Sequence, residues 1–508
     1  MIAALIYWNL LSIDDICFYQ KIHYQKDRYL NTMDLMVKDL ILMIILSVGV
    51  ILLEIYDVAI LYYLIILMML PAAIKKTKIF QDKLKVTKRI IRLFLLIVFL
   101  DFLFLALSLI IWEVLNQLIM LFMMIFHHFV FYLYIWICDP IEISIRKSYV
   151  LKAKKKCDQF EGIKIGITGS YGKTSIKNLV YDVLSMKYLC LKTRASYNNE
   201  MGITKTILEE MNDQEVFICE MGADHMHEIE DLCTFVEPVI GIVSAVGPQH
   251  LSTFKSIENI LHEKMKLLES LPKQGMGFFN FDNFYLHEQE MNLACEVTRV
   301  GLHSASQLKA VNLVCDHLGS QFDVMLENHL VHFSTVLLGE HNILNCLFAI
   351  GIGHYLKVDP VLIQMAIACA KPIEHRMELK PFYKGMCIDN AYNSNPESAR
   401  ISLEVLKMMP GRHLIVTPGF IDLGELHGYY SKVFGMQMAF CEKIVLIGEC
   451  SDIVSGLKEV HYDMENVAYC VTMKDALILM RAMIEEGDTM LIENDIPEIL
   501  MNASEKKA

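Results

Sequence analysis

The segment 168–175, TGSYGKTS, holds the residues best suited to chemistry. It follows the β-branched run 163–167 and precedes a helical pattern, so the order is strand, glycine-rich turn, helix. In such a turn the backbone N–H groups wrap phosphates, the lysine reaches the outer phosphates and the threonine hydroxyl holds Mg²⁺. We therefore expect ATP to bind here. The residues expected to contact it are Gly169, Ser170, Gly172, Lys173, Thr174 and Ser175.

Glu220 ends the predicted strand 215–219 and is placed like a Walker-B-type acid. Mg²⁺ prefers carboxylate, hydroxyl and water oxygens, so Glu220 is a candidate metal ligand. A phosphate loop alone does not separate a transport ATPase, a kinase and a ligase. The sequence has no second phosphate loop and no LSGGQ string, which argues against an ABC-type transporter.

Six further segments occur in a fixed order after the phosphate loop. They are TRASYNNEMGITKTIL (193–208), EMGADHMHEI (220–229), SAVGPQHLSTFKSIENILHEKMKLL (244–268), LLGEHNILN (337–345), EHR (374–376) and IDNAYNSNPES (388–398). From residue 162 to about 500, this series resembles the Mur ligase family and is most similar to its MurF-like branch, whose members add D-alanyl-D-alanine.

The resemblance implies an ATP-dependent carboxylate–amine ligase. ATP phosphorylates a carboxylate to an acyl phosphate, and an amine then attacks to form an amide. The resemblance implies catalytic roles for Lys173, His250 and Lys264. By this resemblance, His250 is the histidine ligand of a second metal ion, and Thr174 and Glu220 are further metal ligands. Lys264 is the lysine that carries a carbamate. An amphipathic-helix lysine is ordinarily a solvated charge, and Lys266 lies only two positions away.

The resemblance also implies nucleotide contacts near the end of the central domain and beyond it. Asn342 and Asn345, with His341, match a helix start whose amides pair with adenine, although Asn342 could instead cap that helix. Arg376 and Asp389 match positions that contact the phosphate or the ribose. An interdomain salt bridge is a further role open to Arg376.

Alternating strand and helix patterns from Met386 onward predict a second doubly wound domain. The expected strands are 386–390, 413–417, 443–448 and 489–494. The predicted fold is thus an α-helical transmembrane region followed by α/β, with a P-loop Mur-type central ATPase domain and a C-terminal Rossmann-like domain. The predicted boundaries are 1–150, 158–371 and 372–508.

The first 150 residues are predicted to form a multi-pass membrane region. The loop 75–92 is strongly basic, as is the segment after the last apolar run, so both are expected in the cytoplasm together with the catalytic domains. Asp101, His127 and His128 lie within the apolar runs, where they could serve a substrate path or, more simply, satisfy one another. The expected spans are 40–53, 58–70, 93–112 and 118–138, with 1–13 as a fifth candidate.

Composition excludes other classes of protein. The chain has 508 residues, of which 54% are hydrophobic, and a formal net charge of −13. The acidic excess lies after residue 150, which argues against nucleic-acid binding. The 14 cysteines form no CxxC pair, and most lie in apolar runs, so free thiols are expected.

Three features depart from the MurF-like pattern. Asp389-Asn390 stands where that branch typically has two acids, and the strand-end turn 417–420 reads TPGF in place of an acidic turn. Membrane spans also stand where the wall-precursor ligases have a UDP-sugar-binding domain.

The sequence therefore predicts a membrane-anchored ligase that uses ATP and Mg²⁺. The expected partners are ATP, an amino-acid or dipeptide amine, the lipid bilayer and a carboxylate envelope precursor, whose attachment to a lipid would explain the spans. A synthase of a poly-γ-glutamate-type polymer and an ATP-driven transport or regulatory ATPase are the alternatives.

Overall fold

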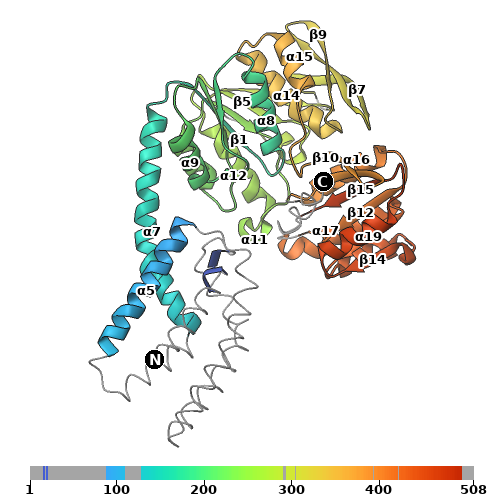
Figure 1. The fold of residues 1–508 in the computed structure, drawn as a ribbon. Coiled ribbons are helices and arrows are strands. Elements are labelled where there is room, and N and C mark those ends of the chain that lie inside the picture. The colour runs from blue at the N-terminus through green and yellow to red at the C-terminus, as the bar shows by residue number, and fades with distance from the viewer. Residues whose placement is uncertain are drawn as a thin grey trace, which may run out of the picture. The chain divides into compact units, whose positions relative to one another are not determined.

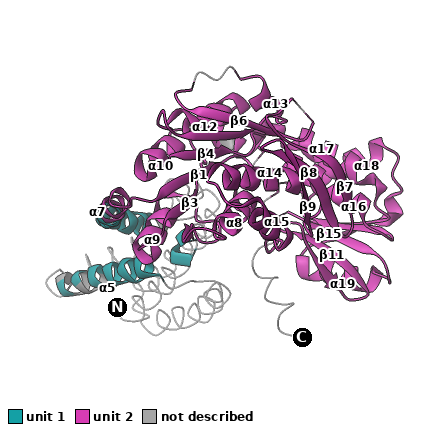
Figure 2. Cartoon of the chain, turned by 90° about the horizontal axis from the view of Figure 1, so that it is seen from above, with its two compact units in different colours: residues 1–149 teal, residues 150–508 magenta. Residues whose placement is uncertain are grey.

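The computed structural model describes residues 15–17, 19–20, 87–108, 127–289, 293–303, 305–392, 394–420 and 423–494. The chain forms two compact units, residues 1–149 and residues 150–508 (Figure 2). Every residue expected to act in catalysis or ATP binding lies in the second unit.

In the first unit, the longer described helices are α5 (Lys88–Ser108) and the N-terminal part of α7 (His127–Asp158) (Figure 1). Arg92 donates from Nε and Nη2 to the two carboxylate oxygens of Glu142, at 2.5 and 2.7 Å. This two-point ion pair fixes α5 against α7. Within the described ranges, no helix combines the length and the apolar character that crossing a membrane requires.

Much of the predicted membrane region lies outside the described residues. The side chains of Asp101, His127 and His128 lie outside them as well. The predicted spans that fall outside, wholly or in part, are 1–13, 40–53, 58–70, 93–112 and 118–138. The membrane region therefore stays a prediction.

The larger sheet in the described part of the second unit has the strand order β2-β3-β1-β4-β5-β6-β7-β8-β9. Neighbours are parallel from β2 to β7, whereas β7, β8 and β9 are antiparallel. Because β1 lies between β3 and β4, the carboxyl ends of these three strands meet at one edge, the usual ligand site of such sheets. The strands are β1 (Ile163–Thr168), β2 (Cys190–Lys192), β3 (Val216–Glu220), β4 (Ile240–Val243), β5 (Met276–Asn280), β6 (Glu296–Gly301), β7 (Leu308–Asp316), β8 (Gly319–Leu326) and β9 (His329–Thr335).

Helices cover both faces of this sheet. One face packs on α8, α14 and α15 through buried side chains that include Val180 and Ile350. The other face packs on α9, α10 and α12 through side chains that include Ile203 and Leu267. The helices of this domain are α8 (Lys173–Leu184), α9 (Glu200–Glu210), α10 (Glu228–Val236), α11 (Leu251–Phe254), α12 (Ile257–Glu269), α13 (Phe284–His287), α14 (Glu340–Tyr355) and α15 (Pro360–Ala368).

The second sheet has the order β10-β11-β15-β12-β13-β14, and its neighbours are parallel except for β10 and β11. Helices α16 to α18 contribute to the core on one face, and α19 contributes to the core on the other. The strands are β10 (Glu378–Phe382), β11 (Gly385–Asn390), β12 (His413–Thr417), β13 (Lys443–Ile447), β14 (Val467–Cys470) and β15 (Thr489–Glu493). The helices are α16 (Pro396–Met408), α17 (His427–Gln437), α18 (Ser451–Glu459) and α19 (Met473–Met483).

The prediction of two α/β domains is confirmed, and the predicted boundary at 371/372 falls between β9 and β10. Sequence patterns missed the edge strand β14 and the helix α18 before it. The side chains of β14 are only partly buried, so the strand lacks the continuous apolar run that marked its neighbours.

Candidate functional site

The turn between β1 and α8 has the backbone geometry of a phosphate loop. Gly169 has φ +146° and Gly172 has φ +81°, values that favour glycine. A Cβ on Gly169 would lie 2.1 Å from Ser244 Oγ, so a larger residue would also clash. Ser170 N donates to Ala245 O at 2.8 Å, which ties the loop to the segment after β4. Glycine is thus required here by backbone conformation and by close packing.

Lys173 begins α8 and folds back over this loop. Its Nζ donates to Gly169 O at 2.5 Å and to Ser170 O at 3.4 Å. Burial lowers the pKa of Lys173 to about 8; Glu220 raises it, and Arg376 lowers it further. A phosphate next to this amine would favour its charged form.

Glu220 ends β3 and is almost fully buried. Thr174 Oγ1 donates to its Oε1 at 3.1 Å, and Asn198 Nδ2 lies 3.4 Å from the same oxygen. Lys177 Nζ lies 2.8 Å from the other oxygen, and the side chains of this ion pair are each 1% exposed. The neighbouring hydroxyl and carboxylate form a hard-oxygen donor set that suits Mg²⁺. Lys177 was not predicted from the sequence, although it lies one helical turn after Lys173.

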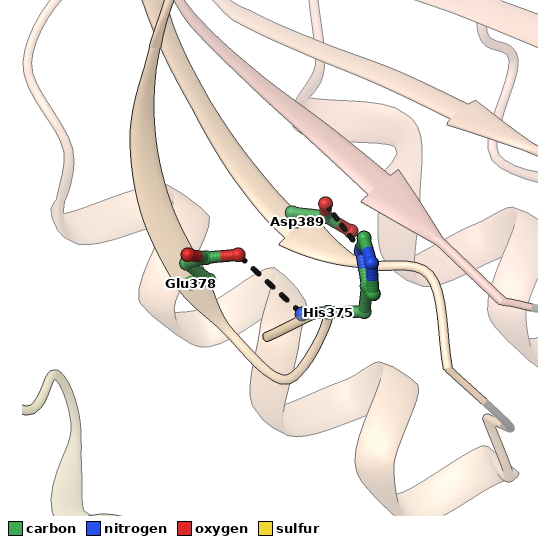
Figure 3. A group of neighbouring side chains, drawn as sticks. All are labelled: His375, Glu378 and Asp389. Carbon is green, nitrogen blue, oxygen red and sulfur yellow. Dashed lines mark hydrogen bonds and ion pairs between the residues drawn. The ribbon is translucent and has the colours of Figure 1, made fainter. Parts of the chain in front are cut away.

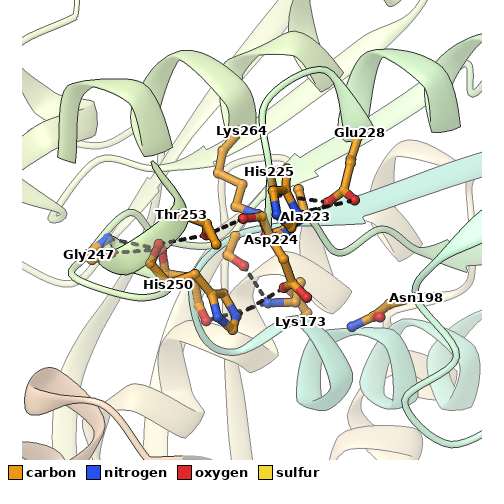
Figure 4. Close-up of polar contacts among 12 residues, drawn as sticks. Lys173, Asn198, Ala223, Asp224, His225, Glu228, Gly247, His250, Thr253 and Lys264 are labelled. Atoms are coloured by element: carbon orange, nitrogen blue, oxygen red, sulfur yellow. Dashed lines mark hydrogen bonds and ion pairs between the residues drawn. The ribbon is translucent and has the colours of Figure 1, made fainter. Parts of the chain in front are cut away.

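Lys264 reaches from α12 to the loop that follows β3 (Figure 4). Its Nζ donates to Ala223 O at 3.3 Å and lies 5.8 Å from the centre of the Phe254 ring. Burial, reinforced by the charge of Lys173, lowers the pKa of Lys264 to about 7. Lys266 instead pairs with Glu269 at 2.7 Å. Of the two lysines, only Lys264 has the buried setting that suits a reactive amine.

His250 precedes α11 and has a left-handed backbone, with φ +52°. Its Nε2 lies 3.2 Å from Asp224 Oδ1, so the imidazole faces the loop that Lys264 also contacts (Figure 4). Asp224 was not predicted from the sequence. The signal that could have indicated it is its position four residues after the strand-end acid Glu220.

One cavity of about 330 Å³ collects most of the predicted site residues. Its lining comes from the phosphate loop, from the ends of β3 and β11, and from the start of α14. The predicted residues that line it are Ser170, Gly172, Lys173, Thr174, Ser175, Glu220, His250, Asn342, Asn345 and Arg376. Gly169, Lys264 and Asp389 do not line it, although Gly169 and Lys264 each contact a residue or loop that does.

The interpretation of Asn342 as a helix cap is wrong. Helix α14 begins at Glu340, and Gly339 is its N-cap residue. Asn342 lies inside the helix and donates from Nδ2 to Leu338 O at 2.9 Å, while Asn345 Nδ2 donates to Asn342 Oδ1 at 3.3 Å. Both amides are therefore held at the wall of the cavity.

Asp389 does not line the cavity, and its carboxylate is engaged by other side chains. His375 Nδ1 lies 2.8 Å from Asp389 Oδ2 (Figure 3). Lys380 Nζ donates to the same oxygen. His375, Glu378 and Asp389 could by their spacing hold a metal ion. The Lys380 ammonium already pairs with both carboxylates of this group, so we interpret it as a structural ion-pair cluster. The next residue, Asn390, does line the cavity.

Arg376 supplies a second cation to the cavity from the segment before β10. Its guanidinium lies 4.3 Å from the centre of the Tyr392 ring, which fixes its orientation. Burial lowers the pKa of Arg376 below its ordinary value, and Glu220 opposes that shift. The cavity thus faces two desolvated cations, Lys173 and Arg376, which suits a polyphosphate.

Comparison with known proteins places this geometry in a family. The model of the Mur ligase middle domain matches residues 167–353. A UDP-N-acetylmuramoyl-tripeptide–D-alanyl-D-alanine ligase of Mycobacterium bovis is 30% identical over 354 residues, which cover 65% of this chain and 69% of that protein. The chain belongs to the Mur ligase family. It is accordingly an ATP-dependent amide ligase.

Two further similarities concern another relative and a solved structure. The enzyme of the same name from Bacillus subtilis is 25% identical over 335 residues, 65% of this chain and 72% of that protein. A crystal structure of MurF ligase from Thermotoga maritima in complex with ADP has a TM-score of 0.63 and 20% identity, and the match covers 72% of this chain and 85% of that one. The structural match shows that the two chains share a fold.

We predict that Lys173→Ala lowers ATP turnover of this Mur ligase at least about a hundredfold, since a cation that meets transferring charge in a desolvated site has effects of this size. The melting temperature should change little, because the hydrogen bonds of the Lys173 amine to described residues are to loop carbonyls. Lys266→Ala is the control and should keep wild-type turnover. Undiminished turnover of Lys173→Ala would contradict the phosphate-loop assignment.

Proposed function

We propose that this Mur ligase joins a carboxylate of a peptidoglycan or related envelope precursor to an amine through an acyl phosphate. The observation that carries the proposal is the single cavity shared by the phosphate loop, the Thr174–Glu220 pair, His250 and Arg376. The relatives' printed names support a wall-precursor substrate.

Different residues of the cavity serve different parts of phosphoryl transfer. Backbone N–H groups of the loop hold the phosphates, and Lys173 and Arg376 stabilise the charge that develops as the carboxylate oxygen attacks the γ-phosphorus and the bond to ADP breaks. Thr174, Glu220 and His250 would hold Mg²⁺, which supplies further neutralisation of the phosphate oxygens. The amine nitrogen then attacks the acyl carbon, phosphate leaves, and the nitrogen loses a proton.

Lys264 is proposed to act as a carbamate. Carbamate formation requires the neutral amine to attack CO₂, and a pKa of about 7 makes that form abundant near neutral pH. The product is an anion, and Lys173 is close enough to influence the charge of Lys264. The carbamate would therefore offset the cationic charge beside the phosphates and help to orient Lys173.

A larger cavity of about 1000 Å³ adjoins the nucleotide cavity and suits the organic substrates. The two cavities share Tyr171, Asn280 and His341, so a ligand in the larger one reaches the phosphate end. Phe420, from the turn that departs from the MurF-like pattern, lies in its wall. An altered acceptor amine is therefore part of the proposal.

We further propose that the first 150 residues attach the enzyme to the cell membrane, with the catalytic domains in the cytoplasm. Described side chains support this: Leu95 and Phe99 of α5 and Trp136 of α7 are about 60% exposed, and large apolar groups are costly to leave in water. The basic loop 75–92 favours an anionic lipid surface, which suits a lipid-linked carboxylate substrate.

Mass spectrometry of reaction products tests the proposed function. Membranes that contain the enzyme are given ATP, envelope-precursor extracts and a panel of amino acids and dipeptides. We expect a product whose mass equals precursor plus amine minus water, formed together with ADP and phosphate and absent with Lys173→Ala. A ladder of repeated additions would identify a polymer synthase, and ATP turnover without any amide product would contradict a ligase.

Carbamylation of Lys264 predicts a carbon signal from ¹³C-bicarbonate in nuclear magnetic resonance. The signal should be stronger at pH 8 than at pH 6, because the amine is mostly protonated below its pKa of about 7. Lys264→Arg should lack the signal, whereas Lys266→Arg should keep it. If bicarbonate depletion leaves activity intact and the wild type shows no signal, the carbamate is ruled out.

Membrane attachment predicts that the full-length enzyme stays in the membrane pellet after high-salt and carbonate washes and is released by detergent. Burial of apolar side chains in lipid resists both washes, whereas surface charge pairing does not. Release by salt alone would reduce the role of the first 150 residues to electrostatic association.

A further inference from the structure

Asn390 and Glu493 lie side by side at the carboxyl ends of two neighbouring strands. Asn390 ends β11, Glu493 ends β15, and the two residues are partners in the parallel register. Asn390 lines the nucleotide cavity and is 4% exposed, whereas Glu493 is 0% exposed. The pair therefore connects the wall of the cavity to the interior of the C-terminal domain.

Three donors converge on the Glu493 carboxylate. Asn390 Nδ2 donates at 2.9 Å and Ser402 Oγ at 2.6 Å to Oε2, and Ser394 Oγ donates to Oε1. Burial raises the pKa of Glu493, while these hydrogen bonds oppose that shift. Among the described residues, the groups that contact the Glu493 carboxylate are neutral donors and not cations, so these donors are what stabilise it.

The carboxylate determines which end of the Asn390 amide turns toward it. An ionised carboxylate only accepts hydrogen bonds, so the amide must present its nitrogen to Glu493. The amide oxygen is then the group left to meet a ligand. Asparagine fits this position better than a second acid, because two carboxylates at this distance in a buried site cannot both be ionised.

We propose that Glu493 is a positioning residue that holds Asn390 so that its amide oxygen accepts a hydrogen bond from a ligand in the nucleotide cavity. The inference rests on the proposed function, because that function assigns ATP to this cavity. The ligand donor is an O–H or N–H group, supplied by the ATP ribose or by the substrate amine. A neutral acceptor thus takes the place that the MurF-like pattern commonly gives to an acid.

A charge-exchange series in the full-length enzyme tests the pairing. Asn390→Asp places two carboxylates together, so we expect at least about a tenfold rise in the ATP KM at pH 8 and a smaller rise at pH 6, where one of the two carboxylates is protonated. Asn390→Asp combined with Glu493→Gln again pairs one amide donor with one carboxylate acceptor. The double variant should therefore have an ATP KM close to that of the wild type, and the difference between pH 8 and pH 6 should largely disappear.

Binding of a non-hydrolysable ATP analogue separates this inference from the proposed function. If the wild type binds no analogue, the proposed function fails. If the wild type binds it but the double variant is no better than Asn390→Asp, the pairing is refuted. Asp488→Asn is the control: Asp488 pairs with Arg412 in the same domain and does not line the cavity, so this variant should lower the melting temperature and leave the ATP KM unchanged.

Asn390→Leu identifies the source of the ligand donor. A ribose donor predicts that wild type and variant differ for ATP but not for deoxy-ATP analogues that lack the donating hydroxyl. An amine donor predicts a higher KM for the amine with an unchanged KM for ATP. If Asn390→Leu keeps the wild-type KM for both ATP and the amine, the proposal is overturned.

Discussion

The buried ion pair between Lys177 and Glu220 is the contact on which the geometry of the nucleotide site depends. The two groups lie 2.8 Å apart, and each side chain is 1% exposed. A carboxylate buried at the end of β3 without a cation would carry an uncompensated desolvation cost. Because Lys177 neutralises one oxygen, the other stays available to Thr174, and α8 is held in register with β3. The phosphate loop leads into α8, so the same contact also positions the loop.

Around this pair the enzyme brings together charged and polar side chains from both α/β domains. The central domain contributes Lys173 and His250, the connecting segment contributes Arg376, and the C-terminal domain contributes Asn390. Burial lowers the pKa of Lys173 and of Arg376, so each gains from an anion placed beside it. A nucleotide therefore stabilises the arrangement of the two domains as well as its own site. Mutual dependence of this kind suits a ligase that must exclude water from a reactive acyl phosphate.

Local patterns were sufficient for the phosphate loop, because strand, glycine-rich turn and helix are adjacent in the chain, and for the strands with continuous apolar runs, although not for β14 or for α18. Glu220 was predictable for the same reason, as the last residue of a continuous apolar strand. Asp389 and Asn390 show where this approach fails: successive residues of a strand face opposite sides, and the motif does not say which side faces the cavity. Asp224 and Glu493 were missed because their roles arise from contacts with residues distant in sequence. Lys264 could be selected over Lys266 by family resemblance, whereas its burial and lowered pKa required the fold.

The central claim is that the γ-phosphoryl group passes to a substrate carboxylate and not to water. Turnover of ATP in H₂¹⁸O, with envelope precursor and amine present, tests this most directly, because mass analysis of the released phosphate reports which oxygen attacked phosphorus. Transfer to a carboxylate predicts phosphate whose new oxygen comes from the substrate, so water-derived ¹⁸O is absent. One ¹⁸O atom in every released phosphate would show direct hydrolysis and would contradict the account.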